Sequence, residues 1–268
     1  MKFIYNPRLS LFFNMLPKKD AKLVLDDGSI FYGSSFGAEI SLSGEVVFST
    51  GMVGYPESLT DPSYRGQILC MTYPLIGNYG MPSGEKDNFG LEKHFESSKI
   101  QVNGLVISDY SFKYSHWNSK MSLANCLKKH SIPAIYDVDT RALAKRIREH
   151  GTMLGKIIID GKDPGFFDPN KFDIAQEVSI REPIIYDPVK KISFKVRNRN
   201  EEISKGNSCK TAILVDCGAK NSIIRNLIAR GLRIIRVPYN HDFFGFDSDG
   251  IVISNGPGDP KTYDKTIG

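Results

Sequence analysis

The sequence predicts a mixed α/β protein in two parts, a strand-rich amino-terminal domain followed by an incomplete, doubly wound parallel α/β domain. Short apolar runs separated by loops rich in Gly, Pro, Ser and Asn dominate the first half of the chain, which predicts strands. Two stretches there show helical signals, and from residue 211 onward strand and helix patterns alternate. With 268 residues, 41% of them hydrophobic and 24% charged, the chain has the size and balance of two ordinary globular domains.

The first domain is expected over residues 21–190. It opens with a predicted β-hairpin, because Asp27-Gly28 separates two apolar runs and is a dipeptide typical of tight hairpin turns. The second of its two helices can be capped by Asp139 or Thr140 and is ended by Gly151. The expected strands are 22–25, 30–32, 45–48, 67–72, 104–107, 132–136 and 156–159, and the expected helices are 122–130 and 140–150.

Residues 160–210 are predicted to be mostly connecting chain. Asp-Pro and Glu-Pro steps recur there, and a residue that precedes proline avoids helical backbone angles. One short helix is expected over 173–178, and the basic residues 191–210 are expected to form the linker between the two domains.

The second domain is expected over residues 211–268. A continuous apolar strand, an amphipathic helix that ends at Gly231 and another strand predict a βαβ unit, and a third buried strand precedes a glycine-rich turn. Parallel sheets occur almost only with helices on both faces, so three strands with one crossover helix should leave most of the sheet bare. We therefore expect this domain to be incomplete. Its elements are the strands 212–215, 233–237 and 250–254, the helix 220–230 and the turn 255–260.

The formal net charge of +5 is concentrated in two segments. Residues 1–20 carry a net charge of +3 and residues 190–210 a net charge of +5, which leaves −3 for the rest of the chain. No aromatic residues are spaced along these basic stretches as in a nucleic-acid groove, so no nucleic-acid partner is expected. No apolar run is long enough to cross a bilayer, and no membrane partner is expected either. The leader 1–20 fits an organellar presequence or a start codon placed too early, with Met15 nearer the true start.

The cysteines and histidines show no metal-binding or disulfide pattern. The four cysteines lack CxxC pairs, and the histidines lack a zinc-type spacing, so free thiols in a reducing cytoplasm and no metal are expected. No Walker motif and no strand-linked GxGxxG occurs, so we expect no nucleotide cofactor on this chain. The cysteines are Cys70, Cys126, Cys209 and Cys217.

The turn Asn255-Gly256-Pro257-Gly258 follows a parallel strand at its carboxyl end, where ligands bind in open α/β sheets. Its glycines let a ligand approach the main chain, and Pro257 fixes one torsion between them. Such a rigid turn can present the Gly256 N–H to a developing oxyanion, a contact that contributes roughly 10² to 10³-fold in acyl-transfer rates. The alternative is an ordinary turn after a strand.

Long motifs in both domains resemble one family. GIVISNGPGDP at 250–260 and VDCGAKN at 215–221 resemble the start of a class I glutamine amidotransferase domain of flavodoxin-like fold. GEVVFSTGMVGYPESLTDPSYRGQILCMTYPLIGNY at 44–79, GLVISDY at 104–110 and DVDTRAL at 137–143 resemble the amino-terminal domain of the small subunit of carbamoyl-phosphate synthetase. The resemblance runs from residue 21 to the end of the chain in the family's order.

The resemblance implies that glutamine is bound by Ser63 in the LTDPSY loop and by Gly256 and Gly258, with Gly256 serving the oxyanion. The family's cysteine nucleophile lies in a GxCxGxQ elbow, assisted by a histidine and a glutamate. None of these is present, and the elbow is expected beyond Gly268, so no catalytic residue is assigned. Cys217 follows a strand, but its Asp-Cys-Gly setting is not an elbow, and the other cysteines are weaker candidates.

The resemblance also implies a partner. A large subunit, which uses ATP and Mg²⁺, would combine the ammonia released from glutamine with bicarbonate to make carbamoyl phosphate for arginine and pyrimidine synthesis. The chain alone should hydrolyse no glutamine. Two alternatives remain open: a non-hydrolysing docking module of an ammonia-dependent synthetase, and an unrelated flavodoxin-like domain that shares the SNGPGDP turn by chance.

Overall fold

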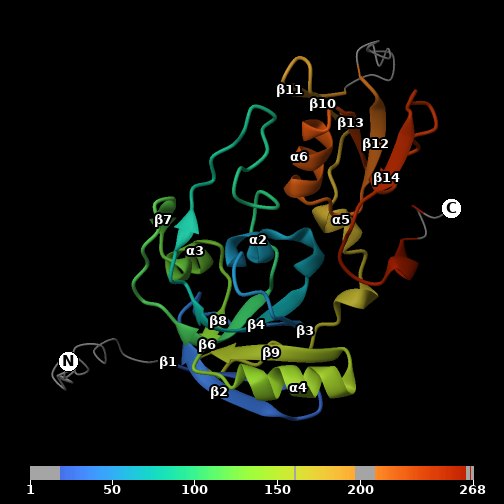
Figure 1. Ribbon diagram of the computed structural model, residues 1–268. Coiled ribbons are helices and arrows are strands. Elements are labelled where there is room, and N and C mark those ends of the chain that lie inside the picture. Colours follow the sequence, from blue (N-terminus) through green and yellow to red (C-terminus); the bar gives the residue numbers. More distant parts are fainter. Residues whose placement is uncertain (1–18, 160, 197–208, 264–265, 267–268) are drawn as a thin grey trace.

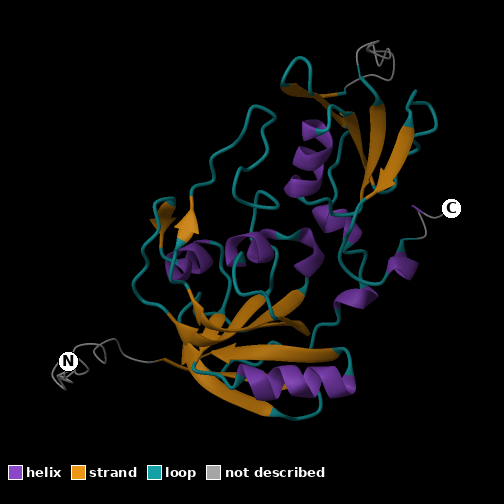
Figure 2. Cartoon of the chain, in the orientation of Figure 1, coloured by secondary structure: helices purple, strands orange, loops and turns teal. Residues whose placement is uncertain are grey.

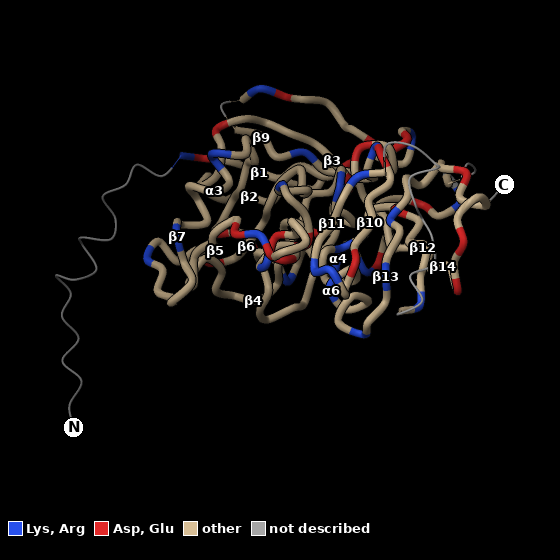
Figure 3. The backbone as a smooth tube through the Cα atoms, turned by 90° about the horizontal axis from the view of Figure 1, so that it is seen from above, with Lys and Arg blue, Asp and Glu red and all other residues tan. Residues whose placement is uncertain are grey.

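The computed structural model describes residues 19–159, 161–196, 209–263 and 266, and these form two sheet-based domains that pack side by side (Figure 1). Most of the strands in the first domain build a closed barrel, and those of the second form an open five-stranded sheet (Figure 2). Figure 3 shows acidic and basic residues interspersed along both domains. Across the described ranges, none of the helices has the length and apolar composition of a membrane-spanning segment.

The barrel of the first domain has the strand order β1-β2-β8-β6-β4-β3-β9, and β9 closes it by pairing antiparallel with β1. Its middle strands β3, β4, β6 and β8 run parallel to one another. The strands are β1 Lys19–Leu25, β2 Ile30–Ser35, β3 Leu42–Ser49, β4 Gln67–Ile76, β6 Gly104–Tyr110, β8 Ala134–Tyr136 and β9 Met153–Ile159. A separate short pair consists of β5 Met81–Pro82 and β7 Ser119–Met121.

Helices cover the barrel through two apolar clusters. Leu143 and Ile147 of α4 (Thr140–His150) join the cluster that the inward-facing residues of β1, β4 and β9 form. On the other side, α2 (Tyr55–Thr60) and α3 (Leu123–Lys129) pack onto β4 and β6 through residues such as Leu59 and Leu127. Because α2 lies against the barrel, the short helix η1 (Pro62–Tyr64) that follows it is held at the edge facing the second domain.

The predicted hairpin, the two helices and the strands of the first domain are confirmed, with changes at their ends. Barrel closure and α2 were not foreseen. Closure depends on pairs such as Ala21 with Ile159, which no local pattern reveals. The leader expected over 1–20 lies outside the described residues except for Lys19 and Asp20, which belong to β1.

The prediction of connecting chain over 160–210 is wrong in part. The short helix α5 (Ala175–Val178) lies where a helix was expected, and η2 (Pro169–Lys171) precedes it. Two further strands, β10 (Ile184–Asp187) and β11 (Ile192–Lys195), were missed, because prolines flank β10 and β11 lies in the basic stretch that was assigned to the linker. Since β10 pairs with β13, this sheet begins before residue 190, and residues 192–195 of the expected linker are a strand. Residues 197–208 lie outside the described part.

The second domain is an open sheet of order β11-β10-β13-β12-β14, in which β13, β12 and β14 are parallel. The predicted βαβ unit is confirmed as β12 (Thr211–Asp216), α6 (Asn221–Ala229) and β13 (Arg233–Pro238), and β14 (Gly250–Ile253) is the third strand. A last turn, η3 (Pro260–Thr262), follows the glycine-rich turn.

The expectation of a mostly bare sheet is wrong for its centre and holds at its edge. The side chains of β12 and β13 that face α6 are buried with it, and those on the other face are buried against Ala175 and Tyr263. The edge strand β14 was predicted to be buried, yet Ile251 is 52% and Ile253 65% exposed. This sheet therefore lacks cover along β14 within the described chain.

The loop between β5 and β6 joins the two domains by capping α6. The Glu96 carbonyl accepts a hydrogen bond from Asn221 N–H (2.9 Å), and its carboxylate accepts one from Ser222 N–H (2.8 Å). No side chain of α6's own N-terminal residue supplies this cap. Arg225 adds a bond to the Glu92 carbonyl. The amino end of α6 is thus fixed to the first domain, because an uncapped helix end leaves unsatisfied N–H groups.

Candidate functional site

The loop that carries Ser63 and the turn that follows β14 meet where the two domains touch. Asn255 Nδ2 donates a hydrogen bond of 2.8 Å to Ser63 Oγ across 192 residues of sequence. The two segments singled out in the sequence therefore lie together, and a side chain of the turn makes the contact.

Ser63 is held by its own short helix as well as by Asn255. Asp61 caps η1, and its carboxylate accepts a hydrogen bond of 2.9 Å from the Ser63 N–H. The other Asp61 oxygen lies 3.5 Å from Lys220 Nζ, at the amino end of α6. The backbone of Ser63 is thus fixed by a group that also pairs with the second domain.

Gly256 occupies a place with no room for a side chain. A Cβ there would collide with the Cys217 carbonyl oxygen and would lie 2.6 Å from the Tyr263 hydroxyl oxygen. The Tyr263 hydroxyl donates to the Pro257 carbonyl at 2.8 Å and also lies 3.3 Å from the Cys217 carbonyl. Burial raises the pKa of Tyr263, so the phenol stays protonated and keeps the turn against the end of β12.

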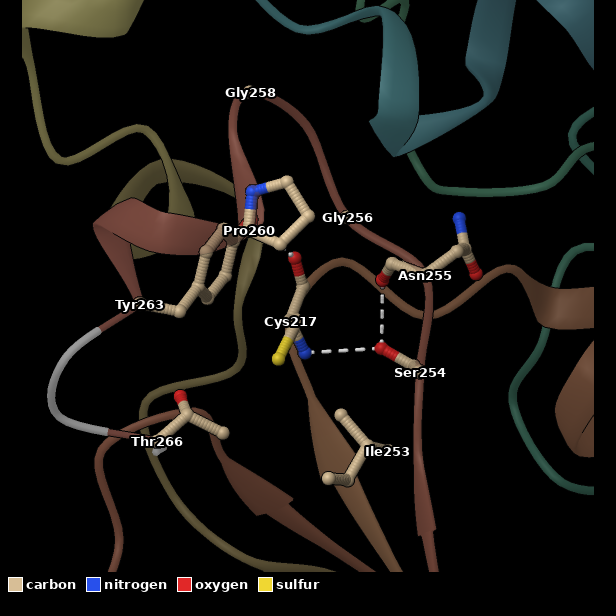
Figure 4. Close-up of a pocket in the computed structure, with 9 residues that line it drawn as sticks. All are labelled: Cys217, Ile253, Ser254, Asn255, Gly256, Gly258, Pro260, Tyr263 and Thr266. Atoms are coloured by element: carbon tan, nitrogen blue, oxygen red, sulfur yellow. Dashed lines mark hydrogen bonds between the residues drawn. The ribbon is translucent and has the colours of Figure 1, made fainter. Parts of the chain in front are cut away.

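A cavity of about 600 Å³ lies along the turn on the side of Cys217 and Tyr263 (Figure 4). Gly256 and Gly258 line it, and Gly258 has a φ of 75°, a left-handed conformation suited to glycine. The side chain of Asn255 points away from Cys217 in Figure 4. The cavity is lined by Cys217, Ile253, Ser254, Asn255, Gly256, Gly258, Pro260, Tyr263 and Thr266.

Cys217 lines the cavity, yet its surroundings oppose nucleophilic chemistry. The residue is 4% exposed, and burial raises the pKa of its thiol, an effect that a hydrogen bond with Thr266 partly offsets. Its N–H donates to Ser254 Oγ at 3.0 Å, which ties the end of β12 to the turn. A thiol held in its protonated form is a poor nucleophile, and Cys217 is therefore a structural residue of the cavity wall.

A buried ion pair supports the end of β12. Asp216 is fully buried and lies 2.8 Å from Arg236 of β13. Asp216 also accepts hydrogen bonds from the N–H groups of Ile180, Gly218 and Ala219, at 2.7, 3.1 and 2.7 Å. These bonds satisfy the carboxylate and fix the course of the chain from β12 to α6, which is where Cys217 and Lys220 lie.

The structure brings the three predicted site residues to one region but not around one cavity. Gly256 and Gly258 line the cavity, whereas Ser63 does not, since its hydroxyl meets Asn255 instead. Sequence reasoning missed Asn255 and Tyr263 as residues of the site. Asn255 lies inside the quoted SNGPGDP motif, so its position was a usable signal, whereas nothing in the sequence marked Tyr263.

No metal site is evident in the described parts of the chain, where no three His, Cys, Asp or Glu side chains gather into a group that could hold an ion.

Comparisons with known proteins match both domains. The family described as "Carbamoyl-phosphate synthase small chain, CPSase domain" matches residues 23–157, and "Glutamine amidotransferase class-I" matches residues 213–268. Among solved structures, an aminopeptidase from Aneurinibacillus sp. strain AM-1 aligns with this chain at 11% sequence identity. The alignment covers 74% of this chain and 39% of the aminopeptidase chain, but the TM-score of 0.29 is too low to indicate a shared fold.

Three curated relatives cover 92% of this chain each. The "Multifunctional protein CAD" of Squalus acanthias is 50% identical over 250 residues, which is 10% of its length. The "Carbamoyl phosphate synthase arginine-specific small chain" of Chaetomium globosum is 42% identical over 255 residues, 52% of its length. The human "Carbamoyl-phosphate synthase [ammonia], mitochondrial" is 47% identical over 248 residues, 15% of its length. The chain thus spans about half the length of the small-chain relative and less of the larger ones. Because the first family covers half of its residues, the chain belongs to the carbamoyl-phosphate synthase small-chain family.

Proposed function

We propose that this chain belongs to the glutamine-handling subunit of a carbamoyl-phosphate synthetase, and that Ser63, Gly256 and Gly258 bind L-glutamine. The observation that carries the proposal is the hydrogen bond between Ser63 and Asn255, because it unites the two motifs that resemble glutamine-binding segments. Gly256 is proposed to direct its N–H at the oxyanion that forms when the glutamine amide is attacked.

The proposed partner is a large synthetase subunit that uses ATP and Mg²⁺ and receives the ammonia. This chain would then need no cofactor of its own. The name of the Chaetomium globosum relative supports a place in arginine synthesis, and we extend the proposal to pyrimidine synthesis. We place the protein in the cytoplasm; the human relative is named mitochondrial, so fractionation of cells expressing the tagged protein tests this assignment.

The 268-residue chain alone is proposed to bind glutamine without hydrolysing it. It contains no GxCxGxQ elbow, and its Cys217 is buried with a raised pKa. Purified chain incubated with L-glutamine should release no ammonia above background in a coupled glutamate dehydrogenase assay. Saturation-transfer NMR should at the same time detect glutamine on the wild-type chain and less of it on Ser63→Ala. Ammonia release would refute the first expectation, and equal signals from the two chains would refute the second.

A second candidate is a docking module whose amidotransferase half never hydrolyses glutamine. This candidate is supported by the 47% identity to the human relative whose name specifies ammonia. Sequencing the transcript beyond the codon for Gly268 separates the candidates. A GxCxGxQ elbow supports the glutaminase and GxSxGxQ supports the docking module, while a stop codon would identify a natural stub and exclude the glutaminase for this chain.

A further inference from the structure

The contact between Asn255 and Ser63 fixes the direction in which the serine hydroxyl can act. Asn255 donates and Ser63 Oγ accepts, so one lone pair of that oxygen is occupied at 2.8 Å. Among the residues that the structure describes, no acceptor takes the hydroxyl proton of Ser63. The hydroxyl therefore remains free to donate to a ligand.

The orientation of the Asn255 amide follows from its surroundings. Its Oδ1 is buried and has no hydrogen-bond partner within the described chain. The reversed amide would accept from Ser63 and would bury an unpaired NH₂ group with two donors instead. Buried unpaired donors are rarer than under-satisfied carbonyl oxygens, so the observed orientation is the favoured one.

Packing alone does not explain an asparagine at this position. A buried amide whose oxygen is unpaired is costly, whereas replacing both members of a hydrogen-bonded pair by apolar groups of the same shape can be nearly neutral or stabilising. The one hydrogen bond that the Asn255 side chain makes in the described chain goes to Ser63. The presence of an amide side chain at residue 255 is thus explained by the hydrogen bond that it donates to the Ser63 hydroxyl.

We propose that Asn255 is a positioning residue that holds Ser63 Oγ from across the domain boundary and makes its hydroxyl a hydrogen-bond donor to an acceptor group of the bound amino acid. The inference rests on the proposed function, since it assumes that Ser63 binds glutamine. Asp61 fixes the Ser63 backbone from the same domain, so Asn255 adds the orientation of the side chain.

The experiment measures the Kd of L-glutamine on the 268-residue chain by saturation-transfer NMR for wild type, Ser63→Ala, Asn255→Ala, Asn255→Asp and the double variants. Asn255→Asp keeps the shape but accepts the Ser63 proton, which removes the donor. We expect Asn255→Ala to weaken binding several-fold and Asn255→Asp about tenfold, in line with one lost oriented hydrogen bond. Asn88→Ala and Asn88→Asp on an exposed loop of the first domain serve as matched controls and should match wild type.

The double variants separate a positioning role from a structural or direct one. If Asn255 acts through Ser63, then Asn255→Ala and Asn255→Asp change nothing in the Ser63→Ala background. Additive losses there, or Asn255 variants that bind like wild type while Ser63→Ala binds weakly, would overturn the inference and leave the proposed function standing. A wild-type chain that binds no glutamine would overturn both. Thermal unfolding of each variant identifies any that fail to fold, and Asn255→Asp then carries the test because it keeps the side-chain shape.

Discussion

Replacing Gly256 by alanine should destabilise the second domain by forcing the turn away from β12. The added Cβ would collide with the Cys217 carbonyl oxygen and lie 2.6 Å from the Tyr263 hydroxyl, although such carbons essentially never come within 3.0 Å of another heavy atom. Overpacking of this kind typically costs about 1–3 kcal/mol. Displacing the Tyr263 hydroxyl from the Pro257 carbonyl adds about 0.5–1.5 kcal/mol for one buried hydrogen bond. We therefore expect a loss of about 1.5–4.5 kcal/mol in the free energy of unfolding.

Urea unfolding followed by circular dichroism measures this loss, and Gly250→Ala is the matched control. Gly250 begins β14, and a Cβ there has no heavy atom within 4 Å. Its replacement should change the free energy of unfolding by less than about 1 kcal/mol, with a slight gain from the stiffer unfolded chain. If Gly256→Ala unfolds at the same urea concentration as Gly250→Ala, the steric reasoning about the turn is refuted.

Three further predictions concern the interface, the buried ion pair and the thiols. Glu96→Ala removes the carboxylate that caps the Ser222 N–H of α6 and keeps the backbone carbonyl bond to Asn221, and urea unfolding should show a loss of about 0.5–2 kcal/mol; an unchanged midpoint would contradict the carboxylate cap. Asp216→Asn leaves Arg236 without its buried counter-charge and should cost about 3–5 kcal/mol, so a wild-type melting temperature would rule out a stabilising pair. At pH 8, Ellman's reagent should label half-buried Cys209 well before buried Cys217, whose raised pKa keeps it protonated; labelling in the reverse order would disprove this.

The parts of the fold that were predictable depend on short-range patterns. Asp27-Gly28 between two apolar runs predicted the first hairpin, and the apolar spacing with Gly151 predicted α4. Barrel closure and the pairing of β10 with β13 were not predicted, because they join residues far apart in sequence. The prolines around β10 led to a prediction of connecting chain. They precede and follow the strand, however, where they remove no hydrogen bond between strands.

The candidate site also combines residues that local sequence patterns predicted with a contact that they did not. Gly256 was predicted from its place after a parallel strand, and the structure adds a steric reason for glycine through the neighbouring Cys217 carbonyl. Ser63 was predicted only through the family resemblance of the long motif around it. Its contact with Asn255 spans 192 residues and depends on how two domains dock, which a pattern within either domain does not encode.

The closure of the barrel has a consequence for how the chain emerges from the ribosome. Ala21 pairs with Ile159, so β1 has to wait for 138 further residues before its second neighbour exists. At typical synthesis rates of about 5–20 residues per second, that delay is roughly 7–28 s. Hairpin formation takes only microseconds, so β1 and β2 would form early and then present an unpaired edge. Slower translation lengthens the time for which this edge is exposed to pairing with other chains.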